Sequence, residues 1–184
     1  MNAFKIKDLM VPLEEYATVS VGATLYDAFL SLEQAQGDFD QSKYRHRAVL
    51  VLDDSGKVVG KISQINALSA LEPKYLEMGS NTKIAQYFSS KFIKNLQEQF
   101  SLLNAPLANV CQKAANLKVE EFMARPTEGE YIDIDATLDS AIHQLIMGHH
   151  QSLLVKAGHD VVGILRLTDV FAAVFHTMKA CQIE

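Results

Sequence analysis

Hydrophobic and polar residues follow the same order in the two halves of this chain. Two short alternating runs, "TVSV" at 18–21 and "IDI" at 132–134, predict strands. Thr24 and Thr137 follow them, each directly before a helical run, as helix N-caps do. The apolar residues of these runs keep helical spacing at Leu25, Ala28, Phe29 and Leu32 in one half and at Leu138, Ala141, Ile142 and Leu145 in the other.

Each half continues with two apolar strands joined by a turn and ends with a helix. The first pair of strands is "AVLVL" and "KVVGKI" around "DDSG", and the second is "SLLV" and "VVGIL" around "KAGHD". We therefore expect the order strand, helix, strand, strand, helix in both halves.

The two halves also align residue by residue, which indicates an internal repeat. "VSVGATLYDA" from Val19 falls on "IDIDATLDSA" from Ile132 without a gap, and "RAVLVLDDSGKVVGKIS" matches "QSLLVKAGHDVVGILR" with one residue dropped in the turn. The polar loop "QAQGDFDQSKYR" of the first half is longer than its counterpart "MGHHQ". Ahead of these blocks, the apolar residues Ile6, Leu9 and Met10 fall on Val119, Phe122 and Met123.

Residues 72–116 separate the halves and have a different character. A helical stripe of apolar residues is interrupted by Pro106, and the shorter helical stretch "LANVCQKAAN" follows it. This pattern predicts a helical hairpin whose aromatic stripe covers the core or a dimer contact. The stripe consists of Ile84, Tyr87, Phe88, Phe92, Leu96, Phe100 and Leu103. We expect a first repeat at 1–71, the hairpin insertion at 72–116 and a second repeat at 117–184.

A glycine motif recurs where the last strand of each half meets its last helix. It reads Gly60-x-Ile62-Ser63-x-x-Asn66 in the first half and Gly163-x-Leu165-Arg166-x-x-Asp169 in the second. Together with the repeat, this motif resembles that of the CBS domain pair, or Bateman module. The resemblance implies an α+β fold with two tandem βαββα repeats packed with pseudo-twofold symmetry, the helical insertion lying between them.

The resemblance also implies a function. CBS pairs are regulatory modules that hold adenosine-containing ligands such as AMP, ADP, ATP or S-adenosylmethionine in clefts between the repeats. They are not catalysts, and free-standing pairs commonly form homodimers. We therefore expect a ligand sensor that shifts the packing of its repeats or of a dimer and so alters a regulated protein that the sequence does not identify.

The same resemblance assigns site residues in the second repeat. Asp169 would accept hydrogen bonds from ribose hydroxyls, although a carboxylate at that place also suits a helix N-cap. Arg166 stands where the family has a small hydroxyl; it could grip phosphate oxygens, fill the cleft or pair with a neighbouring carboxylate. Thr168 competes with Asp169 for the cap and is a further candidate contact.

The first repeat supplies a weaker set of site residues. Ser63 keeps the family hydroxyl, while Asn66 replaces the acid and loses its charge-assisted hydrogen bonds. Arg47, in "YRHR" at the entry to a strand, is a candidate for the phosphate end of the cleft or an ordinary solvated charge. A structural dimerisation or scaffold module with degenerate, empty clefts is the alternative function.

Composition removes several other classes of function. The chain has 184 residues, 48% of them hydrophobic, and a formal net charge of -5, which argues against nucleic acid as a partner. No apolar run is long enough for a membrane span, so we expect a cytoplasmic protein without a membrane partner. Cys111 and Cys181 show no disulfide or zinc spacing. We find no enzyme motif and expect no cofactor or metal beyond the regulatory adenosine ligand.

Overall fold

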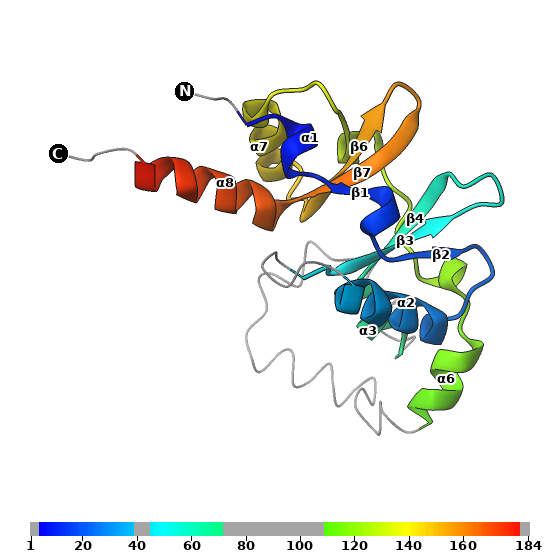
Figure 1. Cartoon of the computed structure of the whole chain (residues 1–184). Helices are drawn as coiled ribbons and strands as arrows, with labels where there is room; N and C mark the ends of the chain where they lie inside the picture. Colours follow the sequence, from blue (N-terminus) through cyan, green and yellow to red (C-terminus); the bar gives the residue numbers. More distant parts are fainter. Residues whose placement is uncertain (1–3, 39–44, 72–108, 181–184) are drawn as a thin grey trace, which may run out of the picture.

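The computed structural model describes residues 4–38, 45–71 and 109–180, and in it the two halves form two sheets with helices packed beside them (Figure 1). The first sheet has the strand order β2-β3-β4, and the second has the order β1-β7-β6-β5. This architecture confirms the predicted α+β class with tandem repeats.

The first repeat has the predicted order of elements. Strand β2 pairs in parallel with β3, and β3 pairs antiparallel with β4. Thr24 caps the first helix, because its Oγ1 accepts a hydrogen bond from the Asp27 amide at 3.2 Å. The elements are β2 (Thr18–Ser20), α2 (Leu25–Asp38), β3 (Ala48–Leu52), β4 (Val58–Ser63) and α3 (Gln64–Ala70).

The second repeat forms the same series, with the same parallel and antiparallel pairings. Thr137 caps its first helix by accepting a hydrogen bond from the Ser140 amide at 3.2 Å. The elements are β5 (Tyr131–Asp133), α7 (Leu138–Met147), β6 (Ser152–Ala157), β7 (Asp160–Arg166) and α8 (Leu167–Ala180).

Shorter elements lead into each repeat. They are α1 (Ile6–Leu9), β1 (Val11–Pro12) and the 3-10 helix η1 (Leu13–Glu15) ahead of the first repeat, and α6 (Val110–Asn116) with the 3-10 helices η4 (Val119–Glu121) and η5 (Glu128–Glu130) ahead of the second. Of the predicted insertion, residues 72–108 lie outside the described residues, and 110–116 form α6, so the hairpin and the repeat boundaries stay predictions.

The entry segment of each repeat pairs with the last strand of the other repeat. Strand β1 lies antiparallel to β7, with Val11 opposite Ile164. At the equivalent place Ala124 and Lys61 exchange backbone hydrogen bonds of 2.8 and 2.9 Å. The two halves are therefore joined by backbone hydrogen bonds at two equivalent places, a strand pairing at one and a single bridge at the other.

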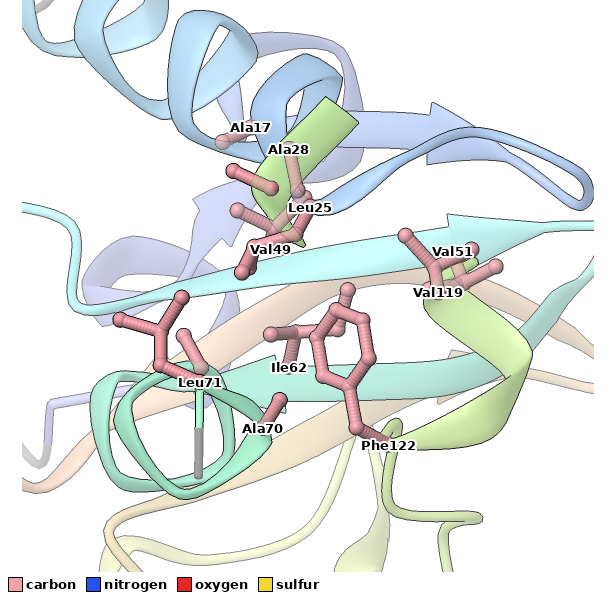
Figure 2. Packing of buried hydrophobic residues seen from close by; sticks show 12 residues of the cluster. Ala17, Leu25, Ala28, Val49, Val51, Ile62, Ala70, Leu71, Val119 and Phe122 are labelled. Atoms are coloured by element: carbon pink, nitrogen blue, oxygen red, sulfur yellow. The ribbon is translucent and has the colours of Figure 1, made fainter. Parts of the chain in front are cut away.

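The apolar side chains of each entry segment also pack into the core of the other repeat. Ile6, which comes ahead of the first repeat, is buried in the core of the second. Val119 and Phe122, which come ahead of the second repeat, are buried in the core of the first, where they lie close to Val51 and Ile62 (Figure 2). Each core is thus completed by residues from the other half.

Two methionines explain why each last strand carries a glycine. A Cβ atom on Gly163 would come within 2.6 Å of the Val11 carbonyl oxygen and 3.0 Å of the Met10 sulfur. A Cβ atom on Gly60 would overlap the sulfur of Met123. The methionine and the glycine that recur in each half therefore contact each other between the halves: Met10 lies against Gly163, and Met123 against Gly60. Each glycine leaves room for the entry segment of the other half.

A third apolar cluster lies between the two sheets. It joins residues of both repeats, which fixes the sheets against each other through buried apolar area. Its buried members are Val11, Tyr16, Ala48, Leu50, Leu154 and Ile164. No helix within the described ranges 4–38, 45–71 and 109–180 is long and apolar enough to cross a bilayer.

Candidate functional site

The corner between β7 and α8 holds an ion pair formed by two predicted site residues. Arg166 ends β7, and Asp169 lies in the first turn of α8, which begins at Leu167. The i,i+3 spacing brings the carboxylate back to the guanidinium: Nε donates to Oδ2 at 2.5 Å and Nη2 donates to Oδ1 at 2.7 Å. Asp169 is therefore not the N-cap of α8, and Arg166 does pair with a neighbouring carboxylate.

Arg166 is buried in this ion pair, and Asp169 is largely shielded from solvent. The Arg166 and Asp169 side chains are 6% and 14% exposed. Burial makes the pair costly to break, since either charge left alone would lose both its partner and its hydration. The first turn of α8 also places Asp169 near the positive end of the helix dipole.

The first repeat faces this corner with two rings. His46, just ahead of β3, places Nδ1 3.5 Å from Arg166 Nη1. The Tyr16 ring packs edge-on against His46, with the ring centroids 4.5 Å apart and the planes at 66°. Because Tyr16 and His46 belong to the first repeat and Arg166 to the second, the corner lies between the repeats.

Both rings are held in their neutral forms. Burial is the main cause and the nearby Arg166 charge the second, and together they lower the pKa of His46 to about 4 against the opposing influence of Asp169 and of the Glu15 backbone. Burial also raises the pKa of Tyr16 to about 12. The only formal charges in the cluster of Tyr16, His46, Arg166 and Asp169 near neutral pH are therefore those of the ion pair, which cancel.

The corresponding corner of the first repeat is neutral. Ser63 is the N-cap of α3 and forms a capping box with Asn66. The backbone amide of Asn66 donates to Ser63 Oγ at 3.1 Å. The backbone amide and the hydroxyl of Ser63 both donate to Asn66 Oδ1, at 3.0 and 2.5 Å. These polar groups are engaged in starting the helix.

Ser63 and Arg47 line one small cavity of about 20 Å³ between α2, β4 and α3. Such a volume suits a single water molecule, whereas sites for drug-sized ligands span roughly 300–1,000 Å³. A nucleoside would need this corner to open. The cavity is lined mainly by apolar residues, including Leu25, Phe29, Ile62 and Ala67.

The six predicted site residues are thus divided between two corners. Arg166 and Asp169 form the buried pair, with half-buried Thr168 beside them on α8, while Ser63, Asn66 and Arg47 lie at the first corner. Their roles as ligand contacts stay predictions.

Sequence reasoning missed Tyr16 and His46. The run "YRHR" looks like a solvated charge cluster, but in an extended segment alternate residues point to opposite sides. Arg45 and Arg47 are exposed, whereas His46 between them is 1% exposed. That alternation was the available signal for a buried histidine.

A shallow pocket of about 620 Å³ lies elsewhere, between η5 and α7. Its lining includes Asp139, His143 and His150 but no arginine or lysine, so it lacks the cations that hold phosphates. None of the predicted site residues lines it.

Metal and thiol chemistry find little support in the part of the chain that the structure describes. No group of three histidine, cysteine or acidic residues there could hold a metal ion. Cys111 is exposed, and Cys181 lies outside the described residues.

Comparison with known proteins agrees with this architecture. The CBS domain family model matches residues 6–73 and 119–176. No curated protein matches the sequence significantly.

Several solved structures share the fold. A CBS domain-containing protein of unknown function from Bacillus anthracis is 18% identical, with 94% of each chain covered and a TM-score of 0.60. The CBS-pair protein CBSX2 from Arabidopsis thaliana is 17% identical over 97% of this chain and 99% of its own, with a TM-score of 0.59. A structure of CBSX2 in complex with AMP is 20% identical over 94% of this chain and 97% of its own, with a TM-score of 0.58.

Proposed function

Because the chain belongs to the CBS domain family and is a CBS-pair regulatory module, we propose that it senses an adenosine-containing ligand that binds between the repeats beside Asp169. The observation that carries this proposal is the position of the Arg166–Asp169 pair, which faces His46 and Tyr16 of the other repeat. The AMP complex of the similar CBSX2 supports the choice of ligand class, which comprises AMP, ADP, ATP and S-adenosylmethionine.

In the bound state Asp169 accepts hydrogen bonds from the ribose hydroxyls, and Arg166 or Thr168 contacts the phosphate end of the ligand. The other corner, with Ser63, Asn66 and Arg47, is the weaker of the two sites, because its polar groups are neutral or exposed. The protein has no catalytic role in this proposal, and its cytoplasmic location stays a prediction.

The ligand acts by favouring one packing of the repeats over another, which requires different affinities for the two arrangements. The structure offers a route for this coupling. Tyr16 directly follows η1, which continues from β1, and β1 pairs with β7. A ligand that moves Arg166 therefore acts on the segment that joins the two sheets.

A homodimer is the second part of the proposal. Ile65 and Leu68 on α3 are 75% and 65% exposed, and Phe171 and Phe175 on α8 are 66% and 49% exposed. Leu68 and Phe171 occupy equivalent places in the two repeats, so a second copy of this chain could cover both helices symmetrically. Sedimentation analysis of the wild type and of Phe171→Asp tests this. A monomeric wild type refutes the dimer.

The alternative is a scaffold module whose clefts bind nothing. Two observations favour it: Arg166 already satisfies both oxygens of Asp169, and Ser63 and Asn66 satisfy each other. In that case the ion pair and the capping box are purely structural.

Isothermal titration with AMP, ADP, ATP and S-adenosylmethionine separates the two functions. The sensor predicts micromolar binding of at least one ligand, lost in Asp169→Asn and kept in Asp160→Asn, a matched change at an exposed aspartate of β7. Asparagine keeps the shape of the side chain and limits damage to the fold. The absence of binding across the panel would refute the sensor for these ligands and favour the scaffold.

A further inference from the structure

The shallow pocket between η5 and α7 lies apart from both corners. It runs along α7, where Asp139, His143 and Met147 line it at successive turns of the helix. These three residues span about 12 Å at about 1.5 Å per residue, the length of about two helical turns. Gly129 of η5 lines the opposite side. None of the lining residues in the described part of the chain belongs to α3 or α8, the helices of the proposed dimer.

The pocket lies where the second repeat has the shorter connection from its first helix to the next strand. Helix α7 ends at Met147 after 10 residues, whereas its counterpart α2 has 14. The chain then turns through His149, whose φ of 52° is left-handed. A Cβ atom on Gly148 would come within 2.1 Å of His150 Nε2, and one on Gly129 within 3.6 Å. The two glycines therefore leave room for the His150 ring, which closes this end of the pocket.

Apolar side chains are exposed at the same end of α7. Ile146 and Met147 are 62% and 68% exposed, and Met147 lines the pocket. A flexible thioether adapts to the shape of its partner, which is why methionines are frequent at protein-binding surfaces. Exposed apolar area beside a pocket of this length suits the apolar face of a partner helix.

The surroundings of the pocket are acidic. Residues 126–150 contain five acidic residues and no lysine or arginine, so their formal charge is -5 with histidine neutral. The other 17 acidic residues of the chain are balanced by its 17 lysines and arginines, so the excess negative charge is concentrated here. Lys61 pairs with Glu130 at 2.6 Å, but Glu128 of η5 and Asp139 of α7 are exposed and form no ion pair within the described residues.

We propose that the pocket along α7 is a docking site for a basic amphipathic helix of a partner protein. The apolar face of that helix covers Ile146 and Met147, and its lysines or arginines pair with Glu128 and Asp139 on the two sides of the pocket. A small anion does not fit this charge. The inference goes beyond ligand sensing, and it holds whether or not an adenosine ligand binds between the repeats.

The test uses a synthetic peptide of about 12 residues with leucines at helical spacing and lysines between them. A second peptide has glutamate in place of every lysine. Each is titrated into the isotope-labelled full chain, and NMR chemical-shift changes give both the affinity and the location of binding. The lysine peptide should shift the signals of α7 and η5 and bind at least about tenfold more tightly than the glutamate peptide.

A charge variant tests the acidic sides of the pocket. Glu128→Gln combined with Asp139→Asn should weaken binding of the lysine peptide about fivefold or more, since each exposed ion pair adds a modest part of the affinity. The matched control is Glu33→Gln combined with Asp54→Asn, which removes the same two charges at exposed residues of the first repeat. The control should change the affinity by less than about twofold.

A second variant tests the apolar contact. Met147→Ser should weaken binding of the lysine peptide about threefold or more, while Met178→Ser, at a methionine of α8 that is 58% exposed, should leave it within about twofold. All of these substitutions are at exposed residues, so the fold is kept, and circular dichroism checks this.

Equal affinity for the two peptides overturns the inference, because charge then does not select the partner. Shifts on α3 or α8 in place of α7 and η5, equal weakening by the pocket and control variants, or no binding of the lysine peptide at about 1 mM overturn it as well. Each of these results leaves the proposed ligand sensing standing, since titration with nucleotides tests that separately.

Discussion

The β4–α3 corner and the β7–α8 corner occupy equivalent places in the two repeats, but their side chains interact in different ways. In the first repeat Ser63 and Asn66 start α3 with a neutral capping box. In the second, Arg166 and Asp169 occupy the same two places and form a buried ion pair that contacts His46 across the repeat interface. The first arrangement serves its own helix, whereas the second also connects the two halves.

The difference between the capping box and the ion pair indicates that the second repeat carries the candidate function. A capping box exchanges short-range hydrogen bonds and is worth about 1 kcal/mol. A buried ion pair depends on the burial of both charges, so a change at either partner alters the whole cluster. The second corner therefore links an event at Arg166 or Asp169 to the packing of both repeats through His46.

Removing the carboxylate should give the largest effect. Asp169→Ala removes the carboxylate that pairs with the buried Arg166 guanidinium and should lower the free energy of unfolding by about 3–5 kcal/mol, measured by urea denaturation. The matched change Asn66→Ala in the first corner should cost about 1 kcal/mol. Similar losses of unfolding free energy in Asp169→Ala and Asn66→Ala would show that the ion pair contributes no more to stability than the capping box does.

Removing both charges sharpens this prediction. Arg166→Met combined with Asp169→Leu should be more stable than Asp169→Ala alone, because both charges of the pair are replaced together by apolar side chains. A double variant that is less stable than the single one would mean that packing, not charge, dominates at this corner.

Acidification should affect the second corner next most strongly. The pKa of His46 lies near 4 in the folded protein and at 6.5 in its ordinary state. Between these pH values His46 is protonated in the unfolded chain and neutral in the folded protein. His46 therefore costs no stability above about pH 7, and its contribution falls by about 3 kcal/mol as the pH drops to about 4.

Comparing the pH profiles of the wild type and His46→Gln isolates this contribution. Other groups that titrate below pH 5 are common to both proteins, and the charges facing His46 are those of Arg166 and Asp169. The profile of His46→Gln should be flatter between pH 7 and pH 4. Parallel profiles would show that His46 is not shielded from protonation.

The glycines of the two last strands should give a smaller contrast. Gly163→Ala places a methyl group 2.6 Å from the Val11 carbonyl oxygen, which belongs to a paired strand, and should cost about 1–3 kcal/mol. Gly60→Ala meets the flexible end of Met123 and should cost less. Thermal unfolding of the two variants measures the contrast, and a reversed order would contradict it.

The sequence predicted the elements of the fold because their patterns are local. Apolar spacing located α2 and α7, and the paired threonines marked their first residues correctly. The alignment of the halves also placed Arg166 and Asp169 opposite Ser63 and Asn66, which is where the structure has them. These features depend on residues close together in the chain.

The exchange of entry segments could not be predicted in this way. Ile6, Leu9 and Met10 show an apolar face, but nothing in their spacing says which of two similar cores receives it. The contact between His46 and Arg166 likewise joins residues 120 positions apart. In both cases the partner is chosen by long-range packing, which single-sequence periodicity does not encode.

The crossed entry segments mean that neither half is a separable building block. A fragment ending at residue 71 would keep Ile6 and Met10 with no β7 to receive them, while its own core would lack Val119 and Phe122. A lone half could complete itself only by embracing a second copy of itself. The two halves are in this sense interlocked, and separating them would leave both cores incomplete.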